Sequence, residues 1–260
     1  MGEIKITHTS GSSISLEAVV NITNPTAYTA RIPYVNLHVV KNGSIVGDAT
    51  VEDVNIVTGN NTNISVSATW GPGVWDSKGL QIGRDLLSQY LSGYNTTVDL
   101  KFHDLSIPGH RLLCEALSKI TVTVAAPQLK LPGDDPEDDT HFIRDAIFHV
   151  FSSTAVFTLV SPLHFNTLYI DTVNATAYYN GSEQVGRIEY DEPFAAPPGA
   201  SQTPKMPVDW SLGGAGYDAV KKALGGTLKL DAFAEVGIRL GNWQDTVWYS
   251  GKGIGASIRI

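Results

Sequence analysis

Hydrophobic and polar positions alternate along most of the chain. A period of two places every second side chain on the same face of an extended strand, so this pattern predicts half-buried β-strands. The longest series has seven apolar positions within residues 228–240, and a helix could not place all of them on one face. Shorter series occupy residues 14–22, 35–39, 64–70, 98–102, 120–124 and 254–260. The pattern therefore predicts a mainly β protein.

Helical spacing is confined to short segments. The apolar positions between Leu80 and Leu91 recur with a helical period and end before Gly93, a residue type that often follows a helix. A second helix is predicted over residues 217–224, where two glycines follow. The spacing at residues 112–117 suggests a third helix.

The two halves of the chain repeat the same order of features. An Asn-Gly-Ser sequence typical of hairpin turns occurs at residues 42–44 and again at 180–182, and Trp70 is matched by Trp210 at nearly the same spacing. Each half then continues with helical spacing and closes with alternating strands. We therefore predict two tandem antiparallel β-sandwich domains, each with one short helix.

An acidic segment that contains prolines separates the two copies. Five carboxylates lie between Asp134 and Asp139, and their repulsion should keep the segment extended and solvated. The spacing of these residues does not match a calcium-binding loop, so a linker is the preferred interpretation. We assign residues 1–130 to the first domain, 131–141 to an acidic Pro/Gly linker and 142–260 to the second domain.

Composition excludes several functional classes. The net charge is −8, and most of it falls in the acidic segment, so no basic surface for nucleic acid is expected. Cys114 is the single cysteine, which rules out an internal disulfide, and its apolar surroundings predict burial. The seven histidines are scattered without ligand spacing, so we expect no metal site. The longest strongly apolar run, residues 155–160, is too short to cross a bilayer.

Catalytic motifs are weak. Residues 214–219 match the dinucleotide pattern G-x-G-x-x-A, but the strands around them alternate as antiparallel strands do, whereas that motif requires a parallel βαβ unit. Residues 255–259 depart from a nucleophile elbow because Arg259 replaces its glycine. Asp191 and Glu192 are interpreted as part of a solvated loop. We expect no cofactor and no enzymatic activity.

Acceptor sequences for N-glycosylation are frequent, with seven in the chain. Ordinary turn chemistry accounts for about two or three of them in a Thr-rich β protein. The excess favours a luminal or extracellular location. The candidate sites are Asn21, Asn42, Asn60, Asn63, Asn95, Asn174 and Asn180.

The long strand at residues 228–240 presents an apolar face that the helix over 217–224 is too short to cover. A strand of this length spans roughly 43 Å, whereas such a helix spans about 12 Å. An opposing sheet is the ordinary cover for this face. The alternative is a hydrophobic groove between sheet and helix that accepts an acyl chain. The candidate groove residues are Leu228, Leu230, Ala232, Ala234, Val236 and Ile238.

The strand over Ala18–Ile22 that runs into Asn24-Pro25, followed by the turn at 42–44 and a helix before Gly93, resembles the late-embryogenesis-abundant group-two domain, also called the water-stress and hypersensitive-response domain. The second copy has Ser161-Pro162 in place of Asn-Pro. A further resemblance links five segments to the C-terminal part of fungal membrane proteins with tandem copies of this domain. These segments are residues 156–165, 185–187, 193–199, 207–212 and 253–257.

The resemblance implies a non-catalytic binding or scaffold module on the luminal side of the fungal vacuole membrane, with the membrane anchor outside this chain. Lipid, the membrane surface and other vacuolar membrane proteins are the implied partners, and one member of the family is implicated in switching off autophagy. Two alternatives stay open. One is a secreted or cell-surface protein with a structural or stress-protective role, and the other is a glycan-acting enzyme, which would need convergent carboxylates in a cleft.

Limited proteolysis tests the domain assignment. The carboxylates of the linker offer no apolar surface for a shared core, so cleavage should begin near Asp134–Asp139 and leave two protected fragments. Mass spectrometry of the fragments identifies the cut. Cleavage spread evenly along the chain would contradict the assignment.

Overall fold

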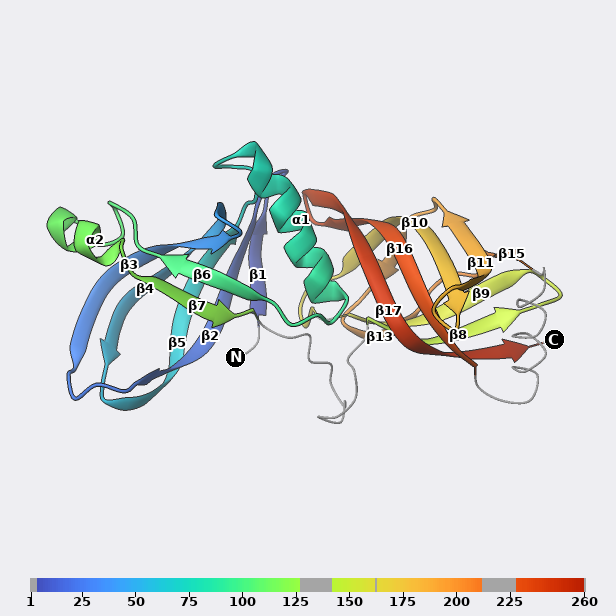
Figure 1. Ribbon diagram of the computed structural model, residues 1–260, viewed down its shortest axis with the longest axis horizontal. Helices are drawn as coiled ribbons and strands as arrows, with labels where there is room; N and C mark the ends of the chain where they lie inside the picture. The colour runs from blue at the N-terminus through green and yellow to red at the C-terminus, as the bar shows by residue number, and fades with distance from the viewer. Residues whose placement is uncertain (1–3, 127–141, 162, 212–227, 260) are drawn as a thin grey trace. The chain divides into compact units, whose positions relative to one another are not determined.

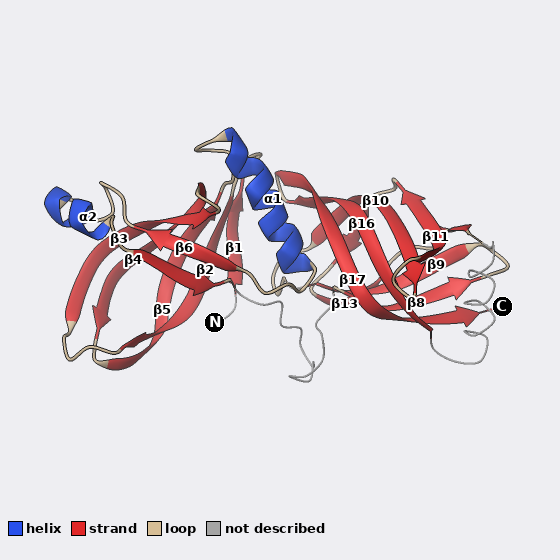
Figure 2. Cartoon of the chain, viewed as in Figure 1, coloured by secondary structure: helices blue, strands red, loops and turns tan. Residues whose placement is uncertain are grey.

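The computed structural model describes residues 4–126, 142–161, 163–211 and 228–259 (Figure 1). The protein is mainly β, with one sheet in each of two compact units, which confirms the predicted fold class (Figure 2). The first unit groups residues 1–86 with 95–127 and 241–243, and the second groups 87–94 with 128–240 and 244–260. The predicted linker lies outside the described residues, so the domain boundaries stay a prediction.

The first sheet has seven strands in the order β1-β2-β5-β4-β3-β6-β7, and its neighbouring strands pair antiparallel. Its strands are β1 (Ile4–Thr9), β2 (Ile14–Asn24), β3 (Ala30–Lys41), β4 (Ser44–Ile56), β5 (Gly59–Trp70), β6 (Thr97–Lys101) and β7 (Thr121–Ala125). The helices are α1 (Ser77–Leu91) and α2 (Arg111–Leu117), at the positions where helical spacing predicted them. The first repeat therefore carries two helices instead of one, and the helix predicted over residues 217–224 lies outside the described residues.

The second sheet follows the order β13-β9-β8-β17-β16-β10-β11-β15, with β12 beside β10 and β14 beside β9. Its strands are β8 (Ile143–His149), β9 (Thr154–Ser161), β10 (Leu168–Tyr179), β11 (Glu183–Tyr190), β12 (Phe194–Ala196), β13 (Gly199–Gln202), β14 (Met206–Pro207), β15 (Asp209–Trp210), β16 (Leu228–Leu240) and β17 (Trp243–Arg259).

One pairing of the second sheet departs from the antiparallel prediction. Residues 255–259 of β17 run parallel to residues 145–149 of β8. These are the last and the first strands of the sheet in sequence, so no short hairpin fixes their relative direction. The sheet is therefore mixed.

The Asn-Gly turns adopt the backbone that their sequence predicts. Asn42 and Gly43 join β3 to β4 with φ angles of 49° and 84°, and Asn180 and Gly181 join β10 to β11 with 51° and 76°. Positive φ at both central residues is the requirement of a type I′ turn, which Asn-Gly meets at little steric cost. These turns fix the register of both hairpins.

The second sheet curls until its two ends meet. Residues 206–211 make the connection, because β14 pairs with β9 and β15 pairs with β11. Two further backbone hydrogen bonds support it: Val208 N donates to Ser153 O at 2.8 Å, and Ser211 N donates to Val185 O at 3.1 Å. The two faces predicted as a sandwich are thus opposite walls of one curled sheet.

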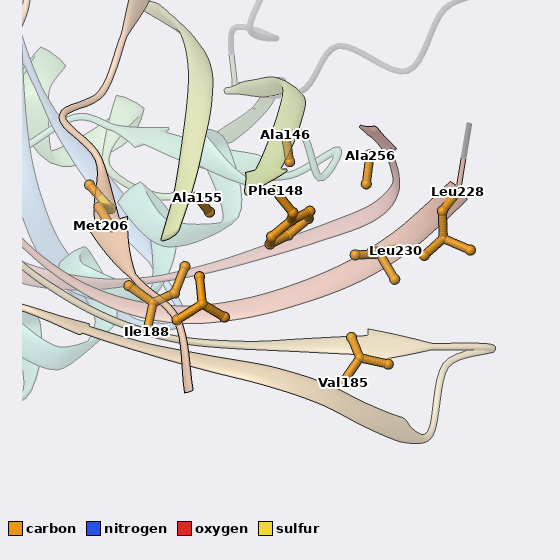
Figure 3. Packing of buried hydrophobic residues seen from close by; sticks show 10 residues of the cluster. Ala146, Phe148, Ala155, Val185, Ile188, Met206, Leu228, Leu230 and Ala256 are labelled. Carbon is orange, nitrogen blue, oxygen red and sulfur yellow. The ribbon is translucent and has the colours of Figure 1, made fainter. Parts of the chain in front are cut away.

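The core of the second unit fills the space inside this sheet. Phe148 of β8 lies among inward side chains from facing strands, including Ile188 of β11 and Leu230 of β16 (Figure 3). Ala155 and Ala256 have no exposed surface. The cluster consists of Ala146, Phe148, Ala155, Val185, Ile188, Met206, Val208, Leu228, Leu230 and Ala256.

Candidate functional site

The curled sheet of the second unit encloses a cavity of about 100 Å³. Side chains of β8 to β12 and of β14 to β17 line it, together with Leu91 of α1. No described lining residue carries a charged side chain. The cavity is therefore a site for apolar groups.

The predicted groove face of β16 forms one wall of this cavity. Ala232, Ala234, Val236 and Ile238 are lining residues. The other two predicted residues, Leu228 and Leu230, belong to the adjoining core cluster. The six residues share the inward face of β16, and the exposed positions of the strand are among the alternate ones.

Short side chains on neighbouring strands create the space. In the pairing of β10 with β16, Ala175 lies opposite Ala234 and Ala177 lies opposite Ala232. All four alanines line the cavity. Directly opposed residues of neighbouring strands project from the same face, so two consecutive inward pairs fill little of the interior.

The opposite wall is aromatic and comes from the sheet itself. Phe148 lies 5.3 Å from Trp210 and 6.2 Å from Phe157 between ring centroids, with tilted or perpendicular planes. Such edge-to-face contacts are favourable and hold the rings in place. Among the residues that the structure describes, strands of the same sheet lie across the cavity from β16, and Leu91 of α1 also lines it. The expected groove is an interior cavity of the sheet.

The polar atoms of the lining residues are buried within the wall. Thr203 Oγ1 accepts a hydrogen bond from Phe157 N at 3.0 Å and donates one to Pro204 O at 2.9 Å. In the described part of the chain, Trp210 Nε1 and Tyr249 Oη are buried without a hydrogen-bond partner. Burial raises the pKa of Tyr249 to about 12 because the phenolate would lose its hydration. The backbone of Ile143 has a smaller opposite effect on this pKa but does not reach hydrogen-bond geometry.

The cavity volume limits what can enter. Apolar cavities of about 150 Å³ stay dry and accept a benzene-sized group, whereas complete small-molecule ligands need about 300–1,000 Å³. A space of about 100 Å³ fits part of a ligand, such as the end of an acyl chain.

A second, polar pocket of about 450 Å³ opens in the first unit between β4 and β5. These strands pair only over residues 47–50 and 67–70 and then separate. Glu52 and Asp53 line the pocket, and Asp53 forms an ion pair with Arg31 at 2.9 Å. One of the two neighbouring carboxylates is thus paired with a guanidinium on the exposed surface.

The structure also shows which of the other candidate residues are exposed and which are buried. All seven candidate glycosylation asparagines are exposed. Asp191 and Glu192 are exposed in the loop between β11 and β12, and Cys114 is fully buried. No cluster of three metal-ligating side chains occurs within the described ranges. No helix in those ranges is long and apolar enough to span a bilayer.

Two models of known domain families match the chain. Residues 1–112 match the Tag1-like fourth LEA-2 like domain, and residues 135–248 match the Tag1-like fifth LEA-2 like domain. The chain belongs to the Tag1-like LEA-2 family. The match confirms the resemblance to late-embryogenesis-abundant group-two domains in tandem, a family that is generally non-catalytic.

No curated protein matches the chain. Among solved structures, the crystal structure of the CupB6 tip adhesin from Pseudomonas aeruginosa aligns over 98% of this chain and 95% of the adhesin at 9% identity. Its TM-score of 0.14 is too low to support a shared fold.

Replacement of Tyr249 by Phe tests whether the cavity wall around the Tyr249 hydroxyl is free of water. The hydroxyl has no partner in the described residues, so Tyr249→Phe should leave the free energy of unfolding at pH 7 unchanged or raise it by about 1 kcal/mol. The pKa of Tyr249 is higher in the folded state than in the unfolded state. The protonated phenol therefore contributes fully to the free energy of unfolding below pH 10, and this contribution is lost as the pH rises toward 12.

Denaturant titrations from pH 8 to 12 provide the measurement. The wild type should lose about 2–3 kcal/mol more than Tyr249→Phe over this range. Tyr28→Phe, at a tyrosine that is 82% exposed, is the matched control and should follow the wild type. Equal alkaline losses in the wild type and Tyr249→Phe would show that the wall is hydrated.

Proposed function

We propose that the chain is a non-catalytic binding module on the luminal side of a fungal vacuole membrane, and that the cavity of its second domain binds the apolar end of a lipid. The uncharged cavity between the paired alanines and the aromatic wall carries this proposal. An apolar group that enters this uncharged space leaves water, which favours its binding.

The chemistry of the lining supports binding over catalysis. The described lining residues include no Asp, Glu, His, Lys, Ser or Cys, which are the usual acids, bases and nucleophiles of enzymes. The hydroxyl of Thr203 is engaged on both sides by backbone groups. A ligand in this cavity therefore meets mainly apolar surface, and the Tyr249 hydroxyl stays protonated near neutral pH because burial raises its pKa to about 12.

The energetics favour weak, reversible binding. Each buried CH₂ group contributes about 0.8 kcal/mol, so a chain end of about five carbons contributes about 4 kcal/mol, which corresponds to a Kd near 1 mM. Tighter binding needs further contacts of the headgroup or the surrounding membrane. Such affinity suits a scaffold that holds to a lipid surface better than a carrier that extracts lipids.

A fluorescent fatty-acid displacement titration tests lipid binding. Ala234 lies in the cavity wall and is 4% exposed, so Ala234→Trp should fill the space and lower affinity at least about tenfold. Phe233→Trp is the control, because this neighbouring side chain is 53% exposed and does not line the cavity. It should bind like the wild type.

Circular dichroism and thermal unfolding establish that both variants are folded. Lipid binding must be abandoned if the wild type shows no saturable binding. It must also be abandoned if folded Ala234→Trp binds as well as Phe233→Trp.

N-glycosylation tests the proposed luminal location. Expressed in a fungal secretory pathway, the protein should carry glycans at Asn42 and Asn180, because both lie in exposed turns. Asn42→Gln and Asn180→Gln should each increase gel mobility by one glycan. Asn24→Gln is the control, because Pro25 makes Asn24 a poor acceptor, and its mobility should not change. Mobility that glycosidase treatment leaves unchanged in the wild type would contradict this proposal.

A further inference from the structure

A polar cluster covers part of the first sheet, and none of its residues lines the cavity. His38 of β3 lies opposite Asp48 of β4 and opposite Lys101 of β6. The segment after β6 brings His103 against it, with 4.0 Å between the two ring centroids. Trp75 also lies near His38, with 6.1 Å between the two ring centroids. Two imidazoles therefore share one partly buried site.

Hydrogen bonds assign the protonation state of His103. Leu105 N donates to His103 Nδ1 at 3.3 Å, so Nδ1 is an acceptor and carries no proton. The opposite nitrogen, Nε2, lies 2.7 Å from Asn36 Oδ1 and donates to it. The Asn36 amide is oriented in turn, because its Nδ2 donates to Thr50 Oγ1 at 2.8 Å and to Asp48 Oδ1 at 3.2 Å. The network fits a neutral His103.

The same turn attaches the following segment to the sheet. Ser106 has no exposed surface, and its Oγ accepts a hydrogen bond from His103 N at 2.7 Å. Ser106 O accepts one from Asn36 N at 2.9 Å, on the edge of β3 that β6 leaves unpaired beyond His38. Ile107 then contacts the Cys114 thiol in α2, with 3.3 Å from Ile107 N to Sγ. The turn at His103 therefore connects α2 to β3.

The surroundings of His38 and His103 contain groups that lower their pKa values and groups that raise them. Burial lowers the pKa of His38, and Asp48 partly opposes this. Burial also lowers the pKa of His103, as does the neighbouring His38, while Asp104 and Asp48 oppose the shift. Lys101 adds a positive charge on the β6 side. Both histidines therefore resist protonation in the folded state.

We propose that residues 103–107 form a pH-sensitive latch, which opens at mildly acidic pH when the histidine pair takes up protons and thereby frees α2 from β3. A proton on His103 Nδ1 points at the Leu105 N–H, so two donors face each other and the turn cannot keep its geometry. A second proton on His38 places two positive rings 4.0 Å apart.

Opening has a defined structural consequence. The N–H of Asn36 loses the carbonyl of Ser106, which leaves a free backbone donor on the edge of β3. The released segment carries Leu105 and Leu112, which are already 75% and 83% exposed. Folding lowers the pKa of both histidines, so the unfolded or open state binds protons more readily. The closed state is therefore favoured above about pH 6.5, and its stability decreases as the pH falls.

Hydrogen exchange on the full chain, corrected for intrinsic rates, tests the latch. Protection of residues 103–117 should fall at least about threefold more between pH 7.5 and 5.0 than protection of β2 and β5. His103→Asn is the key variant, because its side-chain oxygen can accept the Leu105 N–H as an Asx turn does but cannot titrate. It should keep the protection of residues 103–117 nearly independent of pH. His8→Asn, at an exposed histidine of the same unit, should behave like the wild type.

An NMR titration of the imidazole resonances gives a readout that depends on no variant. Both His38 and His103 should titrate below about pH 6.5. A value at or above 6.5 for His103 would overturn the proposal, as would an equal loss of protection in His103→Asn and wild type. Loss spread evenly over the first unit would also overturn it, because it would indicate general acid unfolding.

Discussion

Closure of the second sheet on itself is the constraint on which the cavity depends. Residues 206–211 pair with β9 on one side and with β11 on the other, so one short segment joins the two ends of the sheet. In an open sheet, another element would have to cover the inward face of β16. A closed sheet turns this face toward Phe148 and Trp210, across an apolar space. Strands of this one sheet therefore supply most of the cavity wall, and Leu91 of α1 adds to it.

Two pairs of alanines then decide that the closed interior is not completely filled. Leu or Val at positions 175, 177, 232 and 234 would be compatible with β-structure and would pack the same space, as Leu228 and Leu230 do at one end. A domain that needed only stability would gain from larger side chains, because each buried methylene contributes about 0.8 kcal/mol. The retained space and its lack of charge are what connect this fold to the binding of an apolar group.

The sequence predicted the mainly β fold and the long strand at β16, because period-two alternation is typical of a half-buried strand. It could not predict the closure, since β14 and β15 have two residues each and show no periodicity. The parallel pairing of β17 with β8 joins the two ends of the domain and has no local signal. The cavity needs the register that sets Ala175 against Ala234, which only the folded sheet supplies. His38 and His103 seemed unrelated in sequence because a strand register and a turn bring them together.

Native mass spectrometry of the intact chain with a fatty acid added at about 1 mM, near the expected Kd, tests whether the cavity binds an apolar group. We expect a population carrying one fatty acid, and we expect that a variant with the cavity filled lacks this adduct under the same conditions. A wild-type chain that always has its bare mass would contradict the claim that the cavity is a binding site. The same conclusion would follow if the filled variant retained an equal adduct, because the molecule would then be bound elsewhere.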